Sequence, residues 1–272
     1  MEMEGPVVMK RIICFSGGHS SALAAIETAR KYGTEGIILL NHDISPHVEH
    51  EDIKRFKREV AGYIGLPITY ANMPGWDTTP PLAVAVANKA FKAFNRPAFC
   101  TSRLKTEPFY RWLEENGERG DWVIYGFDAE ETSRMMRRSD IMNAMGYKAV
   151  FPLADWERTI LATEEVGIAR PSTYAIYKHA NCVGCLKAGK QHWYCVYCLR
   201  PDIWEEALAA EEEIGYSIIK GSYLKDLEPQ FREMRDILRI VPTDRGNSAR
   251  FWKKVREALP EEQLEIPCDC SF

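Results

Sequence analysis

Four cysteines in the second half of the chain have the spacing of metal ligands. Cys182 and Cys185 form one Cys-x-x-Cys pair, and nine residues separate it from a second pair, Cys195 and Cys198. Thiolates three positions apart can bind one metal ion, and four of them make the tetrahedral sulfur site that zinc accepts. Sulfur ligands also hold iron–sulfur clusters. The spacing therefore predicts zinc, with a set of metal-free thiols as the alternative, and the residue type also suits an iron–sulfur cluster.

A glycine-containing segment near the N-terminus has the residue types of an anion site. The stretch FSGGHSSALAA begins at residue 15, directly behind a short apolar segment. Its adjacent glycines allow positive φ angles and close approach of a ligand, and the helix predicted after them directs free N–H groups to the same place. The stretch predicts a phosphate site of neither the Walker nor the dinucleotide type; the alternative is a tight connection without a ligand. The candidate ligand-binding residues are Ser16, Gly17, Gly18, His19, Ser20 and Ser21.

Composition limits the class of protein. The chain has 272 residues, 46% of them apolar and 27% charged, with a net charge of −4, as in an ordinary globular protein. Its first residues are acidic where a secretory signal carries positive charge, and no stretch approaches the roughly 20 apolar residues that cross a bilayer. We therefore expect a cytoplasmic location, no membrane partner, and cysteines that are reduced, catalytic or metal-bound.

The elements that must position these residues alternate between strands and helices in the first part of the chain. Nearly continuous apolar runs predict buried strands, and apolar residues at helical spacing separate them. Such alternation predicts an α/β fold, with a parallel sheet and helices on both faces. The predicted strands are 10–15, 35–43, 67–72, 121–128 and 147–153. The main predicted helices between them are 20–33, 48–65, 82–94 and 104–116.

The pattern changes after residue 155. Residues 1–155 are predicted to form a nucleotide-binding α/β domain, because ligands of such sheets bind at the carboxyl ends of the strands. Residues 156–272 are predicted to form a helical, cysteine-rich region that carries the metal site, without a convincing strand. Its predicted helices are 159–167, 201–214, 226–239 and 247–258.

Four segments resemble, in order, motifs of the PP-loop (adenine nucleotide alpha hydrolase-like) group. SGGHSSA resembles the SGGxxS loop, and CTSRLKTEP resembles the CCxxRKVxP segment of sulfonucleotide reductases, with Cys100, Lys105 and Pro108 in register. YGFDAEETSR looks like the glycine, acidic residue and arginine after the fourth strand, and the segment ending in CVGCLKAGKQHW resembles the family's Cys-x-x-Cys region. The resemblance spans residues 10–215 and is closest to phage-type proteins similar to phosphoadenosine phosphosulfate (PAPS) reductases.

The resemblance implies an adenine nucleotide as ligand and sulfur chemistry as activity. Beyond the glycine loop, it implies that Asn41, Asp43 and Gly126 bind the nucleotide, and that Lys105 and Arg134 act on its phosphates or sulfonate. It also implies a [4Fe–4S] cluster, with zinc as the alternative. The implied metal ligands are Cys100, Cys182, Cys185 and, as a fourth, Cys198.

Several positions depart from the family pattern. Ser20 replaces the aspartate that places magnesium in ATP pyrophosphatases, so nucleotide binding is expected more firmly than magnesium-assisted cleavage. Thr101 replaces the second cysteine of the CC motif. The tail, PCDCSF, lacks the family's surroundings for a nucleophile. By resemblance, Cys270 would still attack the sulfonate sulfur and a thioredoxin-like protein would release the product; the alternative is a further metal ligand.

Three hypotheses follow. The chain is a PAPS-reductase-like oxidoreductase, an ATP-dependent iron–sulfur sulfurtransferase acting on a nucleic acid or a small molecule, or a nucleotide-binding module without catalysis. Basic residues between 229 and 258 would suit tRNA or DNA, but mixed-sign solvated helices give the same count. We expect His19 to face solvent, Arg137 and Arg138 to lie on a solvated helix face, and the histidines of 42–50 to belong to a polar loop before a helix.

Overall fold

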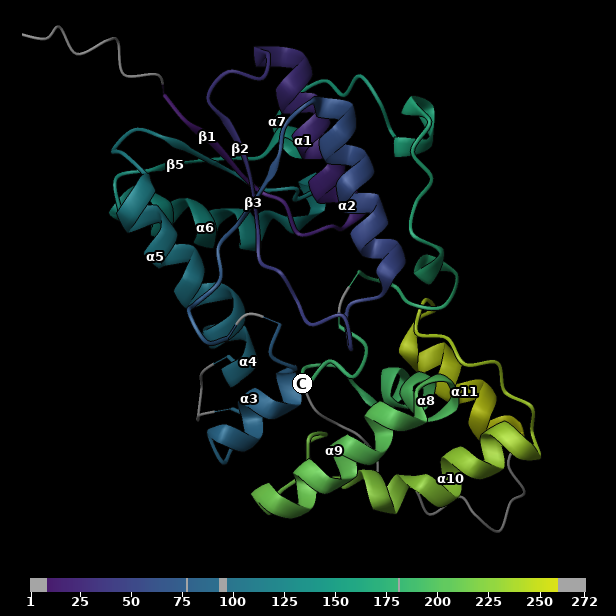
Figure 1. Cartoon of the computed structure of the whole chain (residues 1–272). Coiled ribbons are helices and arrows are strands. Elements are labelled where there is room, and N and C mark those ends of the chain that lie inside the picture. Colours follow the sequence, from purple (N-terminus) through teal and green to yellow (C-terminus); the bar gives the residue numbers. More distant parts are fainter. Residues whose placement is uncertain (1–8, 77, 93–96, 181, 259–272) are drawn as a thin grey trace, which may run out of the picture. The chain divides into compact units, whose positions relative to one another are not determined.

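A five-stranded, all-parallel sheet forms the centre of the first part of the chain. The computed structural model describes residues 9–76, 78–92, 97–180 and 182–258. Its strands run in the order β3-β2-β1-β4-β5 (Figure 1). They are β1 (Arg11–Cys14), β2 (Ile37–Asn41), β3 (Ile68–Tyr70), β4 (Trp122–Ile124) and β5 (Lys148–Val150). The predicted parallel sheet is thereby confirmed.

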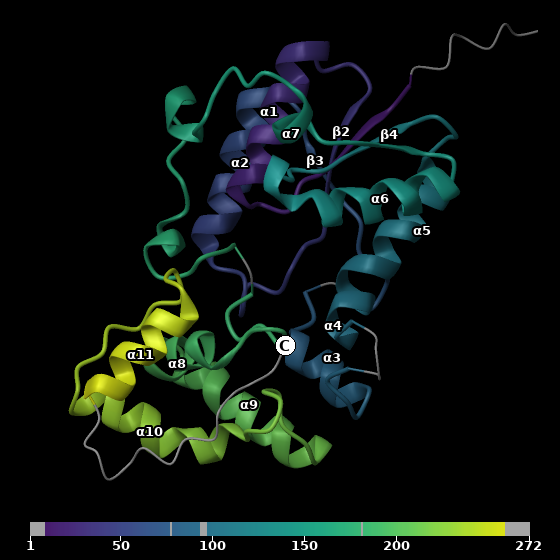
Figure 2. The same cartoon turned by 180° about the vertical axis from the view of Figure 1, so that it is seen from behind.

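Side-chain alternation on the central strand places a hydrophobic core on each face of the sheet. Ile12 and Ile13 are both fully buried and point to opposite faces. Ile13 packs in the core that α1 (His19–Tyr32), α2 (Glu51–Ile64) and α7 (Pro152–Asp155) cover. Ile12 packs in the core that α5 (Glu107–Asn116) and α6 (Thr132–Ala144) cover. Helices therefore lie on both faces, as predicted, and Figure 2 shows them from behind.

The strand order creates a topological switch point beside β1. From β1 the chain proceeds outward to β2 and β3, and then returns to β4 and β5 on the other side of β1. Connections leaving β1 and β4 thus diverge, and their first residues lie together at the carboxyl edge of the sheet. Open α/β sheets bind ligands at this position, and it is where the glycine loop lies.

The chain divides into two compact units, which we call the sheet unit and the helical unit. The described residues of Met1–Pro80, Phe99–Thr173 and His179–Cys182 form the sheet unit. Those of Pro81–Ala98, Tyr174–Lys178 and Val183–Phe272 form the helical unit. This division is discontinuous, unlike the predicted division at residue 155, because an early helix packs against a late one: α3 (Pro81–Ala87) contacts α9 (Pro201–Ile214).

The other long helices of the helical unit include one that contains the second cysteine pair. They are α8 (Lys190–Leu199), α10 (Leu224–Asp236) and α11 (Ser248–Ala258). Helix α8 was not predicted, because residues 191–197 are all buried and leave no amphipathic period to recognise. No helix in the described residues is long and apolar enough to cross a membrane.

The predicted helix at 159–167 is wrong. Only a 3₁₀ turn, Thr163–Val166, forms there. The carboxylate of the buried Glu27 accepts the amide protons of Thr159 (2.7 Å) and Ile160 (3.0 Å) and ties this segment to α1.

The predicted helix at 104–116 begins with an irregular segment. A short helical turn, α4 (Phe99–Thr101), leads into a π-helical stretch, Ser102–Thr106, before α5. π-Helical stretches are rare in proteins, and those that occur are often found at functional sites. This one carries Lys105, and Cys100 lies just before it.

Candidate functional site

The glycine loop joins β1 to α1 by a tight turn that the serines stabilise. Gly18 is the N-terminal cap of α1, and the Ser21 hydroxyl donates to the Gly18 carbonyl oxygen at 2.8 Å. The Ser16 hydroxyl donates to Ser21 Oγ at 3.2 Å. Both hydroxyls therefore hold the loop in shape, and the backbone N–H groups at the start of α1 are the groups of the loop that could bind an anion.

Two glycines are required where the loop meets its surroundings. Gly17 has a φ of +80°, and a Cβ there would lie 2.9 Å from Cγ and Cδ of Lys57. A Cβ at Gly126, just beyond β4, would lie 2.6 Å from the carbonyl carbon and oxygen of Ser20. Gly126 thus lets the start of α1 contact the end of β4, which brings it to the loop in agreement with the sequence-based expectation.

Two residues at the carboxyl end of β2, Asn41 and Asp43, were expected to belong to the site. Asn41 is buried, and its amide nitrogen donates to the carbonyl oxygen of Phe15 at the start of the loop. The Asp43 carboxylate accepts a 2.8 Å hydrogen bond from Lys54 Nζ. Asn41 therefore supports the loop from below, whereas the carboxylate of Asp43 is engaged in an ion pair within the chain.

A pocket in the sheet unit brings four of the sequence motifs together. It is lined by Ser16 of the loop, Asn41 and His42 at the end of β2, Lys105 of the π-helical stretch and Cys182 of the first Cys-x-x-Cys pair. Lys105 is exposed at this pocket and carries its positive charge there. The pocket therefore combines a loop typical of anion binding, a cation and a thiol.

His42 is a neutral hydrogen-bonding group of this pocket. Burial lowers the pKa of His42; the hydrogen bond with Ala71 opposes this, and the positive charges of Lys105 and Lys57 add to the lowering. Nδ1 lies 2.5 Å from the carbonyl oxygen of Ala71 and must donate to it. Nε2 is therefore the unprotonated nitrogen near neutral pH, and it is a hydrogen-bond acceptor.

Cys14 also lines the pocket, but as a protonated thiol. Burial raises the pKa of Cys14 to about 12, although the charge of Arg138 and a hydrogen bond with the Tyr125 hydroxyl oppose the rise. The thiolate is the reactive form of cysteine. Cys182 rather than Cys14 is the candidate nucleophile or ligand at this pocket.

The structure assigns the arginines of α6 differently from the sequence. Arg134 is exposed, pairs with Glu131 and lies over the Phe127 ring at 4.2 Å, and it does not line the pocket. Arg138 is half-buried and lies 5.7 Å from the centre of the Tyr125 ring, close enough to Cys14 to influence its pKa. The expectation of a solvated helix face is wrong for Arg138, and Arg137 alone is exposed as expected.

His19 does not face solvent as expected. Its Nε2 accepts a 3.3 Å hydrogen bond from the amide of Thr163. Burial lowers the pKa of His19 and the charge of Arg170 adds to this, while Glu164 and Asp128 oppose it. The imidazole is neutral at physiological pH and supplies no positive charge to a phosphate.

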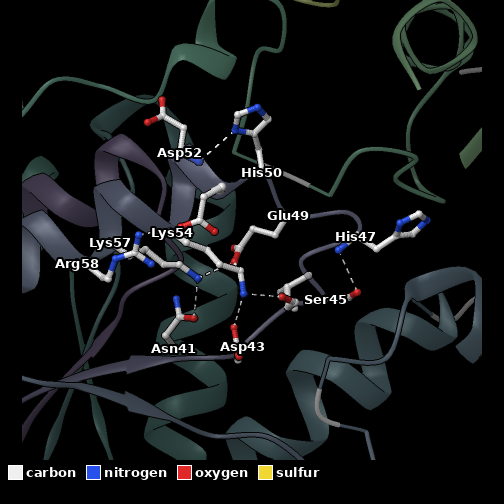
Figure 3. Close-up of polar contacts among 12 residues, drawn as sticks. Asn41, Asp43, Ser45, His47, Glu49, His50, Asp52, Lys54, Lys57 and Arg58 are labelled. Atoms are coloured by element: carbon white, nitrogen blue, oxygen red, sulfur yellow. Dashed lines mark hydrogen bonds and ion pairs between the residues drawn. The ribbon is translucent and has the colours of Figure 1, made fainter. Parts of the chain in front are cut away.

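The loop at 42–50 is a polar connection that ends at a helix, as predicted. His50 caps α2 by accepting the amide proton of Asp52 at 3.1 Å. Glu49 points inward instead and forms ion pairs with Lys54 and Lys57, at 3.7 and 2.8 Å (Figure 3).

One member of the second cysteine pair lies in the hydrophobic core of the helical unit. Cys195 is fully buried on α8, and its thiol donates to the Gln191 carbonyl oxygen at 3.4 Å. Burial raises the pKa of Cys195 and of Cys198; for Cys198, the Tyr194 hydroxyl and Arg235 oppose the rise. Cys195 therefore fits a core position better than the four-cysteine zinc site.

The remaining cysteines leave the cluster a prediction. Cys100 and Cys182 belong to the sheet unit, and Cys185 and Cys198 to the helical unit. Among the residues that the structure describes, no three His, Cys, Asp or Glu side chains are grouped as metal ligands. Cys268 and Cys270 lie outside the described residues.

A histidine that sequence reasoning missed holds the turn of the first Cys-x-x-Cys pair. His192 is buried, and its Nε2 accepts the amide protons of Gly184 (3.2 Å) and Cys185 (3.4 Å). Its Nδ1 lies 2.8 Å from Oδ2 of Asp244, which fixes the tautomer with the proton on Nδ1. The only available signal was a histidine seven residues after Cys185, and nothing marked Asp244.

Comparisons with known proteins give one significant relative. The chain is 25% identical over 247 residues to an uncharacterized nin region protein, ORF290, of Escherichia phage lambda, which covers 80% of this chain and 77% of the relative. A phage relative agrees with the expected phage-type likeness. No protein-family model matches the chain, and no solved structure matches it significantly.

Proposed function

We propose that the chain is a PP-loop enzyme of the PAPS-reductase-like type, which binds an adenine nucleotide at the glycine loop and carries out sulfur chemistry beside it. The pocket in the sheet unit carries this proposal. It joins the loop, the end of β2, the CTSRLKTEP segment and Cys182, which are far apart in the sequence. A connection without a ligand would give no reason for a lysine and a cysteine to line the same pocket as the loop.

Each group has a distinct role in the proposal. The N–H groups at the start of α1 and the positive charge of Lys105 stabilise the phosphate or sulfonate oxygens. His42 accepts a hydrogen bond from a hydroxyl or amino group of the nucleotide. Neither Arg134 nor Arg138 lines the pocket, so Lys105 carries the role on the phosphates that the resemblance shared between Lys105 and Arg134.

The proposed reaction is reduction of an activated sulfonate. A cysteine thiolate attacks the sulfonate sulfur, the bond between that sulfur and the bridging phosphate oxygen breaks, and the nucleotide leaves with the electron pair. A dithiol protein of the thioredoxin type then attacks the cysteine sulfur, releases sulfite and becomes a disulfide. Cys270, by family resemblance, supplies the thiolate. Lys105 stabilises the charge that develops on the leaving oxygen.

We also propose the iron–sulfur cluster that the family resemblance implies. By the resemblance, Cys100, Cys182 and Cys185 would hold it, with Cys198 as the fourth ligand, and a bound [4Fe–4S] cluster would supply a redox centre. Zinc is the alternative.

A second candidate is ATP-dependent sulfur transfer. The observation that favours it is the thiol of Cys182 in the same pocket as the loop, where a sulfur donor would need to lie. Its substrate would be an activated carbonyl on a nucleic acid or a small molecule.

One experiment tests both candidates. Anaerobically purified protein is incubated with PAPS, adenosine phosphosulfate or ATP, with a thioredoxin and its reductase present, and sulfite and pyrophosphate are measured. We expect sulfite from one of the sulfonates. Pyrophosphate formed from ATP only when an acceptor such as tRNA is added would favour sulfur transfer. Neither product, together with no calorimetric binding of any of the three nucleotides, would overturn the proposal.

A matched pair of variants connects the activity to the pocket. Lys105→Ala is expected to lower kcat/KM by about 100-fold, in the range that loss of one stabilising charge produces. Lys220→Ala removes an equally exposed lysine from the helical unit and should leave the rate unchanged. Equal rates in the two variants would exclude Lys105 from the reaction.

A further inference from the structure

A lysine is buried below the glycine loop, where charged side chains are uncommon. Lys57 on α2 is 1% exposed. Its Nζ lies 2.8 Å from a Glu49 carboxylate oxygen and 3.3 Å from Oδ1 of Asn41. Burial of an ammonium group is costly unless it is paired and hydrogen-bonded. Lys57 meets both conditions, but a buried ion pair is weak evidence for stability, so its position calls for another explanation.

The two ends of the Lys57 side chain both reach the loop. The methylene stem lies so close to Gly17 that a Cβ there would approach Cγ and Cδ to 2.9 Å. The ammonium group binds the oxygen of the Asn41 amide, whose nitrogen in turn donates to the Phe15 carbonyl oxygen. The stem therefore supports one residue of the loop by packing, and the head supports another through Asn41.

Glu49 holds the head of Lys57 in this position. Its carboxylate is also 3.7 Å from Lys54 Nζ, and Lys54 in turn binds Asp43 at 2.8 Å. Figure 3 shows these groups in one chain of contacts, from Asp43 through Lys54, Glu49 and Lys57 to Asn41. Burial alone would lower the pKa of Lys54, but the hydrogen bond and charge of Asp43, with Glu49, outweigh it and raise the pKa. The lysine that closes the chain of contacts therefore stays charged.

We propose that Lys57 and Glu49 are positioning residues for the glycine loop, which set the loop in its ligand-binding shape before a ligand arrives. The inference rests on the proposed nucleotide site. The Asn41 amide can donate to Phe15 only when its oxygen faces the other way, toward a donor, and Lys57 is that donor. Removal of the ammonium group frees the amide to rotate, and the loop then loses its support at Phe15 while the stem of residue 57 still packs against Gly17.

Calorimetric titration with ATP and with PAPS tests the inference. Lys57→Met keeps the methylene stem and removes the ammonium group. We expect at least a tenfold loss of nucleotide affinity, with faster hydrogen exchange of the amides of residues 15–18. Arg58→Met is the matched control, because Arg58 is the next residue on α2 and pairs only at the surface with Glu51, at 2.8 Å. It should bind nucleotide as the wild type does.

The double variant Lys57→Met/Glu49→Gln separates positioning from folding. It removes the buried carboxylate that Lys57→Met leaves with Lys54 alone as its cation, at 3.7 Å, and replacing both members of a buried pair is often neutral for stability. A folded double variant that still loses tenfold affinity supports the inference. Affinity within twofold of wild type in a folded variant overturns it, and so does failure of both variants to fold, which would assign the pair a structural role. If the wild type binds neither nucleotide, the proposed function itself is wrong.

Discussion

The glycine loop of the sheet unit and the cysteine turn of the helical unit solve the same problem in different ways. Each is a turn whose backbone groups are satisfied by buried side chains. At the loop, the Asn41 amide nitrogen donates a hydrogen bond to the Phe15 carbonyl oxygen, and Lys57 donates to the oxygen of the same amide. At the cysteine turn, His192 accepts the amide protons of Gly184 and Cys185. Both turns are therefore supported by side chains from neighbouring helices or strands, and the glycine loop also by its own serines.

The two regions differ in what their order depends on. The loop depends on the absence of side-chain atoms at Gly17 and Gly126, so it is sensitive to volume. The cysteine turn depends on a hydrogen-bond relay from backbone to His192 to Asp244, so it is sensitive to chemistry. The turn at the sheet edge thus needs free space, whereas the turn in the helical unit needs acceptors for its amides.

The largest expected effect comes from adding one methyl group at the sheet edge. In Gly126→Ala the new Cβ would lie 2.6 Å from backbone atoms of Ser20, and backbone cannot move aside as a side-chain tip can. We expect the free energy of unfolding to fall by about 3 kcal/mol, at the upper end of overpacking costs, and nucleotide binding to be lost. Urea unfolding and calorimetry measure the two effects.

Gly62→Ala provides the control for this change. Gly62 lies within α2, and a Cβ there would meet no atom within 4 Å. The change should raise stability by up to about 1 kcal/mol, because alanine favours helix. A Gly126→Ala variant that behaves like Gly62→Ala would show that the start of α1 does not need its close contact with β4.

The second expected effect tests the chemistry of the cysteine turn. His192→Ala leaves the amides of Gly184 and Cys185 without their acceptor inside a buried region. We expect a loss of about 2 kcal/mol in the free energy of unfolding, the cost of unsatisfied buried groups, and faster alkylation of the Cys185 thiol. Nucleotide affinity should stay as in the wild type.

An exposed histidine gives the matched control for that variant. His179→Ala removes the same kind of side chain from the surface and should change neither stability nor alkylation. Loss of nucleotide affinity in His192→Ala would break the comparison, since the cysteine turn would then act on the loop.

The sequence predicts the sheet well because its signals are local. Apolar runs followed by a glycine, as in 11–18, define a strand and a turn, and the ordered motifs locate the loop, Asn41 and Lys105 at one pocket. The prediction fails where long-range polar contacts decide. The amides of residues 159 and 160 bind the carboxylate of Glu27, which lies 132 and 133 positions earlier in the chain, and no local pattern shows that contact.

The same limit applies to the candidate site. Cys-x-x-Cys spacing does not distinguish metal ligands from helix-core residues, and Cys195 is a core residue. Lys57 contacts Asn41, 16 positions earlier, and Glu49, 8 positions earlier, and no local sequence pattern predicts these contacts. Arg134 stands at the position of the family's arginine but is exposed, whereas Arg138, one helical turn later, is half-buried.

The smallest expected effect is a pH dependence that only the sheet edge shows. The pKa of His42 is below that of an unfolded histidine, about 6.5. Between the two pKa values the unfolded chain binds more protons than the folded chain, so the free energy of unfolding rises with pH in that range. The contribution of His42 to stability is therefore lost as the pH falls below about 6.5. One such histidine contributes at most about 1.4 kcal/mol per pH unit.

Replacement of His42 isolates this contribution. His42→Gln keeps a donor for the Ala71 carbonyl but cannot titrate, so its free energy of unfolding should fall less steeply between pH 7 and pH 5 than that of the wild type. His19, whose pKa burial also lowers, accounts for part of the slope that remains. His179→Gln should keep the full wild-type slope, because that side chain is exposed. Equal slopes in His42→Gln and the wild type would mean that the imidazole at the pocket is solvated and free to gain a proton, and a pocket so wet would not hold His42 as an acceptor for the nucleotide.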